Sequence, residues 1–176
     1  MSVLLWIVAV VLALAVIVLI LATLKPNTFR VERSAVINAP PEKVFPFVSD
    51  FHQWRAWSPW ENMDADLKRS YGGAEAGKGA TYAWEGRKSG TGRMEITEAT
   101  PSSRVLIKLD FLKPIEAHNT ADFRFTPEGG GTRVDWAMYG PSLFISKVMS
   151  AFVSIDKMLG KNFEQGLAAL KAAAEK

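Results

Sequence analysis

The pattern of hydrophobic and polar positions divides this 176-residue chain into three parts. From Val3 to Leu24 every residue except Thr23 is apolar, and none carries a charge. Several segments between Phe29 and Tyr139 alternate apolar and polar residues, the period of strands with one buried face. From Leu143 to Ala174 apolar residues recur every three or four positions, as in an amphipathic helix. The sequence thus predicts an apolar N-terminal helix followed by a domain of strands and helices.

The apolar segment Val3–Leu24 is long enough to cross a bilayer. At a rise of about 1.5 Å per residue, a helix of this length reaches roughly 33 Å. The alternative is a signal peptide, whose apolar region is usually about 7–15 residues long, follows a basic segment and ends at small residues. Neither Met1-Ser2 nor Leu21–Leu24 fits that description. We therefore expect residues 1–25 to form an uncleaved transmembrane anchor and residues 26–176 to form a separate domain.

The basic residues beside the anchor predict its orientation. Lys25, Arg30 and Arg33 follow the apolar segment, whereas no Lys or Arg precedes it. Loops rich in Lys and Arg remain on the cytoplasmic side of a membrane. We therefore expect a single-pass protein of the cell (inner) membrane with its domain in the cytoplasm. The absence of Cys agrees with this location but is also found in exported proteins.

Seven segments with alternating or β-branched residues predict strands. They are residues 29–37, 67–71, 80–84, 92–99, 104–112, 117–126 and 132–139. Between the first two, Asn38–Glu42 has the cap residue, prolines and acid typical of a helix start, and Trp54–Trp57 indicates a second short helix. Short connections such as Glu128–Gly131 imply antiparallel neighbours.

These elements predict an α+β fold after the first helix. The strands would form a curved antiparallel sheet whose apolar face is covered by one long C-terminal helix over residues 143–174. Gly160 and Gly166 lie within that helical pattern and indicate either close packing on the sheet or a bend. Because a sheet wrapped around one helix is seldom filled completely by side chains, a cavity is expected between them.

Composition and charge exclude several classes of function. The formal net charge is +3 and there is no long block of Lys and Arg, so no nucleic-acid partner is expected. The chain has no Cys and only two His, and it lacks the spacing typical of a metal site, a nucleophile elbow or a phosphate-binding loop. We therefore expect neither a metal nor a cofactor.

Three stretches of the sequence resemble a known superfamily. They are VERSAVINAPPEKVFPFVSDFHQWRAWSPW, FTPEGGGTRVDWAMYGP and SKVMSAFVSIDKMLGKNFEQGLAALK. They resemble the START-like (SRPBCC) superfamily, most of all its polyketide cyclase/dehydrase and lipid-transport branch, including bacterial members with one N-terminal transmembrane helix. The resemblance covers nearly all of the chain after Thr28. It implies a helix-grip fold with a deep apolar pocket between the sheet and the C-terminal helix.

The same resemblance implies a hydrophobic ligand, because members of the superfamily bind lipids, sterols, polyketides or similar molecules, and some catalyse cyclisation. Strand alternation and helical spacing predict which side chains face that pocket. From the sheet these are Tyr82, Trp84, Met94, Ile107, Leu109, Phe123, Trp136 and Met138. From the C-terminal helix they are Phe152, Ile155 and Leu159. We expect these residues to form the ligand-binding site.

Trp54, Trp57 and Trp60 form the densest aromatic cluster in the chain. They could form a pocket rim that contacts a ligand or the bilayer. Alternatively, they form a structural plug where the short helices meet the sheet. We favour the plug, because buried aromatic side chains dominate protein cores.

Charged residues among the strands are expected to face away from the pocket. Alternation places Asp110, Glu116, Asp122 and Asp135 mostly in solvent. Arg87, Lys88 and Arg93 flank a Gly-containing turn; they could contact an acidic headgroup at the pocket mouth or simply be solvated.

Two histidines are the remaining candidates for chemistry. His118 lies on the opposite face from Ala121 and Phe123, so no second catalytic group is placed beside it in a pocket. His52 is expected at the surface.

The sequence therefore favours a membrane-anchored, non-enzymatic binder of a hydrophobic small molecule or lipid. The first alternative is an enzyme of the polyketide cyclase/dehydrase type that uses one polar group, such as His118 or Tyr82. The second is a protein-interaction module, for which an exposed apolar patch around Phe144–Met149 would be evidence.

Overall fold

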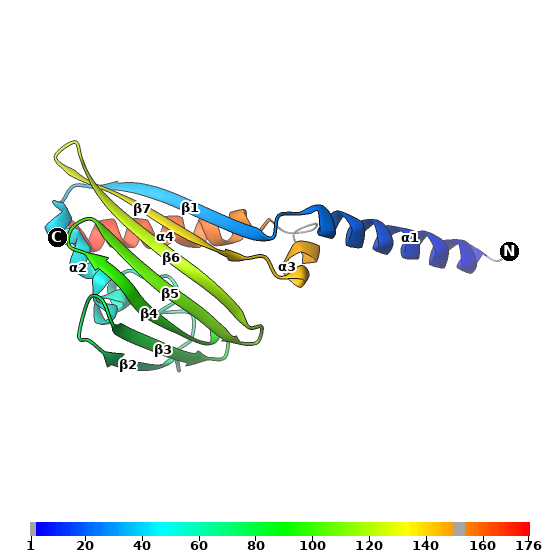
Figure 1. The fold of residues 1–176 in the computed structure, drawn as a ribbon, viewed down its shortest axis with the longest axis horizontal. Helices are drawn as coiled ribbons and strands as arrows, with labels where there is room; N and C mark the ends of the chain where they lie inside the picture. Colours follow the sequence, from blue (N-terminus) through cyan, green and yellow to red (C-terminus); the bar gives the residue numbers. More distant parts are fainter. Residues whose placement is uncertain (1–2, 150–153) are drawn as a thin grey trace.

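The computed structural model describes residues 3–149 and 154–176 (Figure 1). An N-terminal helix, α1, projects from a domain built on one curved sheet, and the C-terminus lies at the far end of that domain. The elements are α1 (Val3–Leu24), β1 (Thr28–Ile37), α2 (Pro41–Ser49), the 3₁₀ helix η1 (Phe51–Ala56), β2 (Lys68–Gly73), β3 (Ala80–Gly86), β4 (Gly90–Thr100), β5 (Arg104–Lys113), β6 (Ala117–Glu128), β7 (Gly131–Pro141), α3 (Phe144–Met149) and α4 (Ile155–Ala174).

Seven antiparallel strands form the sheet, in the order β1-β7-β6-β5-β4-β3-β2. The sheet curves around α4, which packs mainly on β1, and α2 and η1 lie near the C-terminal end of α4 (Figure 1). This is the α+β, helix-grip arrangement that the sequence predicts. Each predicted strand is present and is longer in the structure at one or both ends.

One end of the sheet lies next to α1, and we call it the anchor end. Strands β1, β4 and β6 begin there, while β3, β5 and β7 end there. The register confirms this arrangement, since Thr28 at the start of β1 pairs with Pro141, and Thr91 in β4 pairs with Lys113 at the end of β5. The turns of the β3–β4 and β5–β6 hairpins therefore lie on the same side of the domain as α1.

The prediction of one continuous helix over residues 143–174 is wrong. The structure has two helices, α3 and α4, and α4 begins with its own cap because the Ser154 hydroxyl accepts a hydrogen bond from the Lys157 N–H. Because a capping residue starts a new helix, α4 does not continue the helix that the spacing of Phe144 and Val148 had predicted. As a result α3 packs beside α1 instead of on the sheet (Figure 1). The predicted site residue Phe152 lies outside the described residues.

The joint between α1 and the domain is held by a buried lysine. Lys147 of α3 is buried, and its Nζ donates to the Lys25 carbonyl oxygen at 3.2 Å and to the Asn27 side chain. A cation beside the last carbonyls of a helix satisfies unpaired acceptors and is favoured by the helix dipole. Ala22, near the end of α1, is also buried. The end of α1, α3 and the start of β1 therefore form one packed junction.

Gly160 and Gly166 allow α4 to pack closely, which is the first of the two interpretations that the sequence allowed. A Cβ atom at Gly166 would lie 2.8 Å from Cζ3 of Trp136 and 3.1 Å from Cδ of Pro59. A Cβ atom at Gly160 would lie 2.0 Å from Nη2 of Arg33. The first neighbour is a packed indole ring, whereas the second is the end of a flexible side chain.

We expect Gly166→Ala to destabilise the domain by about 1–2 kcal/mol, because overpacking a core costs more than the gain of about 1 kcal/mol in helix propensity. Gly160→Ala is the matched control and should be nearly neutral, since the Arg33 guanidinium can move and its ion pairs with Asp156 and Glu164 are exposed. Urea unfolding followed by Trp fluorescence measures both changes. Equal stability of the two variants would contradict this packing account.

Candidate functional site

An apolar cavity of about 260 Å³ lies between the sheet and α4. Seven of the predicted site residues line it, namely Tyr82, Trp84, Met94, Leu109, Trp136, Met138 and Leu159. Ile107 and Phe123 are fully buried in the core and do not line the cavity. Ile155 is the first residue of α4, and its side chain lies outside the description. Strand alternation thus identified the cavity face of the sheet, but not which residues on that face pack against other side chains.

Stacked aromatic rings form one wall of the cavity. Trp136 stacks on Phe163 with ring centroids 4.1 Å apart and on Phe123 at 4.9 Å. Trp60 packs edge-on against Trp136 at 5.6 Å. Such pairs contribute about 0.5–1.5 kcal/mol each beyond the area that they bury, so this wall is stabilised by aromatic packing.

The Trp54–Trp57–Trp60 cluster contributes to both the core and the cavity. Trp54 and Trp57 are buried, and their indole N–H groups donate to the carbonyl oxygens of Val48 and Phe47 at 3.0 and 2.8 Å. These two residues fix η1 against α2, as the plug interpretation requires. Trp60 is only partly buried, and both Trp54 and Trp60 line the cavity.

Glu61 supplies a buried carboxylate to the cavity wall, and the sequence analysis missed it. Only 4% of Glu61 is exposed. Its Oε1 accepts a hydrogen bond from the Tyr82 hydroxyl at 2.6 Å, and its Oε2 accepts one from Nε of Arg69 at 2.6 Å. Glu61 follows Trp60 in a loop between η1 and β2, where no periodicity indicates which way a side chain points.

This network determines the protonation of Tyr82. Burial, followed by the hydrogen bond to Glu61, raises the pKa of the Tyr82 phenol far above its ordinary value. The hydroxyl therefore remains a donor at any physiological pH. Hydrogen bonding to Glu61 also raises the pKa of Arg69, which stays charged. Glu61 and Tyr82 thus form a buried polar region in the mainly apolar wall of the cavity.

The cavity reaches the anchor end of the sheet. There its lining includes Trp84, Lys88 and Ser89 of the β3–β4 hairpin and Phe111 near the end of β5. Asp64 holds this hairpin, because its carboxylate accepts hydrogen bonds from the backbone N–H groups of Lys88 and Ser89, both at 2.8 Å. The Ser89 hydroxyl donates a third bond at 2.6 Å.

We expect the hairpin at the cavity mouth to loosen in acid. The Ser89 hydroxyl bond, together with hydrogen bonding from the backbone of residues 87–89, lowers the pKa of Asp64 from 3.8 to about 2. A lowered pKa stabilises the fold fully above about pH 4, and this stabilisation is lost as the pH falls through about 2. The amide NMR signals of Lys88 and Ser89 should titrate with a midpoint near pH 2.

Asp64→Asn should abolish that titration, whereas Asp66→Asn, at an exposed neighbouring position, should leave it intact. If the titration persists in Asp64→Asn, a group other than Asp64 causes it.

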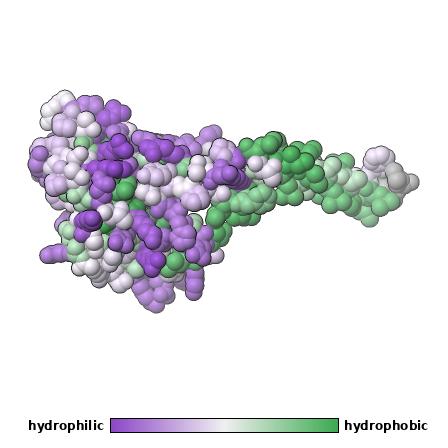
Figure 2. Space-filling view, in the orientation of Figure 1, coloured by the Kyte–Doolittle hydropathy of each residue, from purple (hydrophilic) through white to green (hydrophobic). Residues whose placement is uncertain are grey.

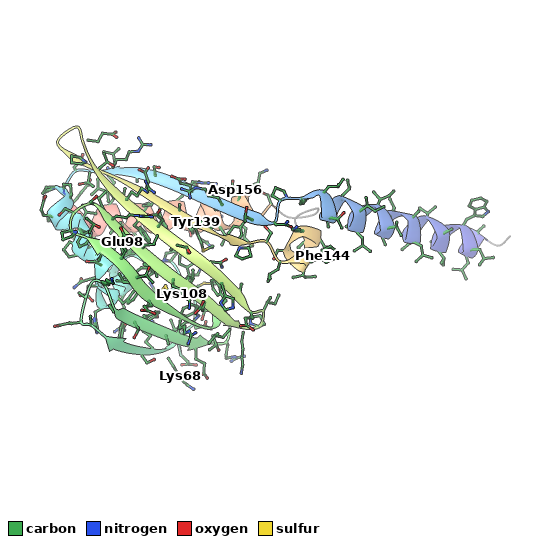
Figure 3. The ribbon with its side chains drawn as sticks, viewed as in Figure 1. Lys68, Glu98, Lys108, Tyr139, Phe144 and Asp156 are labelled. Carbon is green, nitrogen blue, oxygen red and sulfur yellow. The ribbon has the colours of Figure 1, made fainter. Side chains whose placement is uncertain are left out.

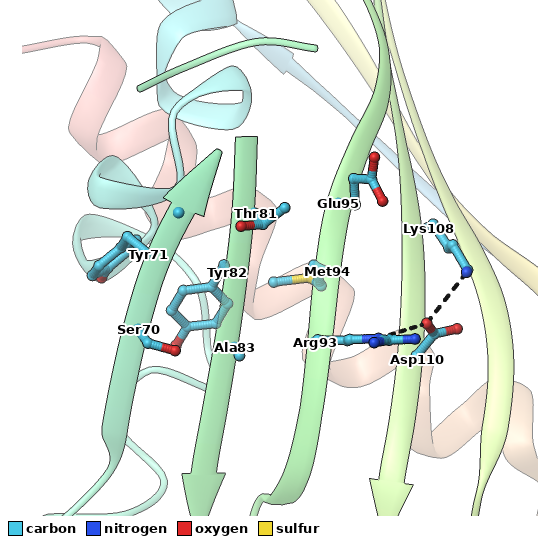
Figure 4. Close-up of a pocket in the computed structure, with 11 residues that line it drawn as sticks. Ser70, Tyr71, Thr81, Tyr82, Ala83, Arg93, Met94, Glu95, Lys108 and Asp110 are labelled. Atoms are coloured by element: carbon cyan, nitrogen blue, oxygen red, sulfur yellow. Dashed lines mark hydrogen bonds and ion pairs between the residues drawn. The ribbon is translucent and has the colours of Figure 1, made fainter. Parts of the chain in front are cut away.

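Charged side chains form ion pairs on the outer face of the sheet. Figure 4 shows a polar surface groove there, where Arg93 and Lys108 approach Asp110. Nε of Arg93 lies 3.1 Å from the Asp110 carboxylate, and Nζ of Lys108 lies 3.5 Å from it. On the other side, Nδ1 of His118 lies 2.8 Å from the same carboxylate. His118 therefore faces away from the cavity, as strand alternation predicts.

The prediction that Asp110 and Asp122 face solvent is wrong. Both point to the outer face, but both are buried, because basic side chains from neighbouring strands cover them. Nε of Arg104 lies 2.9 Å from Asp122. Burial opposes ionisation of each carboxyl, but the hydrogen bonds from His118 and from Arg104, respectively, lower the pKa of Asp110 and Asp122 overall.

The other charged candidates are more exposed. Glu116 is exposed, and Asp135 is half-buried and accepts bonds from Ser34 and Arg133. His52 is exposed and stacks on Tyr71. Within the described residues, no group of three or more His, Cys, Asp or Glu side chains could hold a metal ion.

Solved structures with the same fold have low sequence identity to this chain. Protein CV1439 from Chromobacterium violaceum is 19% identical with a TM-score of 0.59, and the match covers 86% of this chain and 99% of that one. The KanY protein (ms6282) is 14% identical with a TM-score of 0.63, covering 86% and 100%. DynU16, a putative protein in the dynemicin biosynthetic locus, is 16% identical with a TM-score of 0.60, covering 86% of this chain but only 48% of DynU16.

A search of curated proteins finds no match. The family model described as "Polyketide cyclase / dehydrase and lipid transport" matches residues 28–175, which include the sheet, the cavity and α4. The solved structures support the same fold. This chain therefore belongs to the polyketide cyclase/dehydrase and lipid-transport family, within the START-like (SRPBCC) superfamily.

Proposed function

We propose that this protein is a membrane-anchored binding protein for a lipid or another hydrophobic small molecule. The observation that carries the proposal is the apolar cavity between the sheet and α4. Transfer of an alkyl chain from water into such a site is favourable by about 0.8 kcal/mol per methylene. Binding of this kind needs few polar groups, which agrees with the composition of the cavity wall.

The proposed ligand contacts follow from the cavity lining. The apolar part of the ligand packs against Trp84, Met94, Leu109, Met138 and Leu159, and flexible Met side chains adapt to its shape. A polar group of the ligand reaches the Glu61–Tyr82 pair, which offers a carboxylate acceptor and a hydroxyl. A hydroxyl or amine on an otherwise apolar molecule fits this arrangement best.

We propose α1 as the membrane anchor. In the described part of the chain it is the one helix long and apolar enough to cross a bilayer, and its residues are exposed except near the domain. The green surface of α1 contrasts with the largely purple domain in Figure 2. The basic residues after α1 support a cytoplasmic position for the domain, at the inner face of the cell membrane. Tethering raises the local concentration of membrane-derived ligands at the cavity.

The Glu61–Tyr82 pair also supports a second candidate, an enzyme that moves a proton on a bound hydrophobic substrate. A buried carboxylate 2.6 Å from a phenol is a pair that can accept and donate protons at one site. Substrate turnover that is lost in Glu61→Gln while ligand binding remains would support the enzyme. Turnover at the same rate in that variant would exclude Glu61 from the chemistry.

Tryptophan fluorescence tests the binding proposal directly, because Trp54, Trp60, Trp84 and Trp136 all line the cavity. The full chain in lipid nanodiscs is titrated with cis-parinaric acid, an apolar fluorescent probe that accepts energy from Trp. The proposal predicts saturable quenching at one probe per chain. Quenching that only follows the amount of probe dissolved in the lipid would contradict it.

A further inference from the structure

One end of the cavity lies at the end of the domain from which α1 projects. The cavity extends from Trp136 and Phe163 to the β3–β4 hairpin and Phe111, at the anchor end of the sheet. Only Lys25, Pro26 and Asn27 separate α1 from β1, and three residues span at most about 10 Å. The buried Lys147 ties α3 to the same joint. If α1 crosses the bilayer, this end of the domain therefore lies at the membrane surface.

Apolar side chains from two separate elements are exposed at that end. Phe144, Ile145 and Met149 of α3 are each about half exposed, and Phe144 lies beside the base of α1 in Figure 3. Leu112 at the end of β5 and Ile115 in the β5–β6 turn are 41% and 50% exposed. We call these five residues the apolar rim. Large exposed apolar side chains gathered on one side of a domain mark an interaction surface.

Exposed charges at this end of the sheet include the cations Arg87, Lys88 and Lys113 and the acids Asp66, Glu85 and Glu116. Basic side chains next to exposed apolar ones suit the interface of a membrane with anionic lipids. Asp64 is bound to the β3–β4 hairpin, so Lys88 is held at the cavity mouth. Because exposed acids lie beside these cations, burial of apolar side chains is the main attraction that this surface offers to a bilayer.

We propose that the apolar rim inserts into the lipid headgroup region, so that the cavity mouth opens directly onto the bilayer. The proposal rests on the proposed function and deepens it, because it makes a membrane lipid the ligand class and removes any passage through water. The occupant of this surface is the bilayer in which α1 is anchored, not a second protein. The short link and the Lys147 contacts favour the bilayer, since they hold the apolar rim within reach of it.

Depth-dependent quenching tests the proposal, and the lack of Cys in this chain makes single labels simple to place. Phe144→Cys and Ile115→Cys are labelled with an environment-sensitive fluorophore. Leu12→Cys in α1 is the positive control. Glu128→Cys, in the β6–β7 turn at the opposite end of the sheet, is the negative control. Each full chain is reconstituted in phosphatidylcholine/phosphatidylglycerol liposomes that contain lipids spin-labelled near the headgroup or deep in the acyl chains.

The proposal predicts that headgroup-level spin labels quench the Phe144 and Ile115 positions strongly and the Glu128 position hardly at all. Phe144→Asp should lower the equilibrium constant between docked and undocked states, read from the Ile115 label, by about tenfold, the factor expected for losing one inserted Phe. If the Leu12 label is quenched but the rim labels behave like the Glu128 label, the proposal that the rim inserts is wrong. The proposal that α1 is a membrane anchor is then still supported. If the Leu12 label is not quenched either, the membrane anchor of the proposed function fails as well.

Discussion

Replacing Ala121 with Phe should weaken binding of the proposed hydrophobic ligand about a hundredfold while the domain stays folded. Ala121 is a small residue on β6 that lines the cavity, so a phenyl ring at this position projects into the space of about 260 Å³. If the ring displaces about four methylenes of ligand, the loss of about 3 kcal/mol weakens binding by about a hundredfold. The ring enters a cavity instead of a filled core, so overpacking costs at the low end of about 1–3 kcal/mol.

Ala83→Phe is the matched control, since it makes the same substitution on the outer groove of β3. The cis-parinaric acid titration compares both variants with the unaltered chain, and urea unfolding reports their stability. Unchanged saturable quenching in Ala121→Phe would place the ligand somewhere other than this cavity. Equal loss in both variants would mean that the substitutions act on the fold and not on the site.

Replacing Glu61 with Leu destabilises the domain by about 2–4 kcal/mol, because it leaves the buried Tyr82 hydroxyl and the Arg69 guanidinium without their shared acceptor. Glu61→Gln should cost less, since the amide oxygen still accepts a hydrogen bond from Tyr82. Adding Tyr82→Phe to Glu61→Leu should recover part of the loss, because the second change removes one of the stranded polar groups. Urea unfolding followed by Trp fluorescence measures each free energy.

Glu95→Leu, at an exposed position on β4, is the control for this series and should change the free energy of unfolding by less than about 0.5 kcal/mol. A Glu61→Leu variant as stable as Glu95→Leu would show that the Glu61 network contributes no stability. In that case the buried carboxylate of Glu61 would act only in binding the ligand.

The sheet could be predicted from the sequence because its signals are local. Alternation in segments such as 104–112 and the turn at Glu128–Gly131 determine strands, their inner face and their antiparallel pairing without knowledge of distant residues. The same rule gave the correct direction for His118 and for Asp110. It did not predict that Asp110 is buried, because the covering Arg93 and His118 come from neighbouring strands.

The site was only partly predictable, because its features depend on tertiary contacts. Ile107 lies on the same face of the sheet as Leu109, yet only Leu109 reaches the cavity. Strand alternation predicts the face on which a side chain lies, but not its distance from α4. Glu61 lies in a loop, where no helical or strand periodicity predicts the direction of its side chain. The α3–α4 division had one local signal, since Ser154 with Asp156 in the next turn is typical of a helix start, but the continuing apolar spacing obscured it.

Native mass spectrometry of the full chain shows whether the cavity holds a hydrophobic ligand. The protein is extracted gently from the cells that produce it, and its mass is compared with that of a denatured sample and of Ala121→Phe prepared in the same way. We expect one bound hydrophobic molecule per chain, released on denaturation and absent from Ala121→Phe. A chain that carries no bound mass, or an equal bound mass in the variant with the filled cavity, would contradict it.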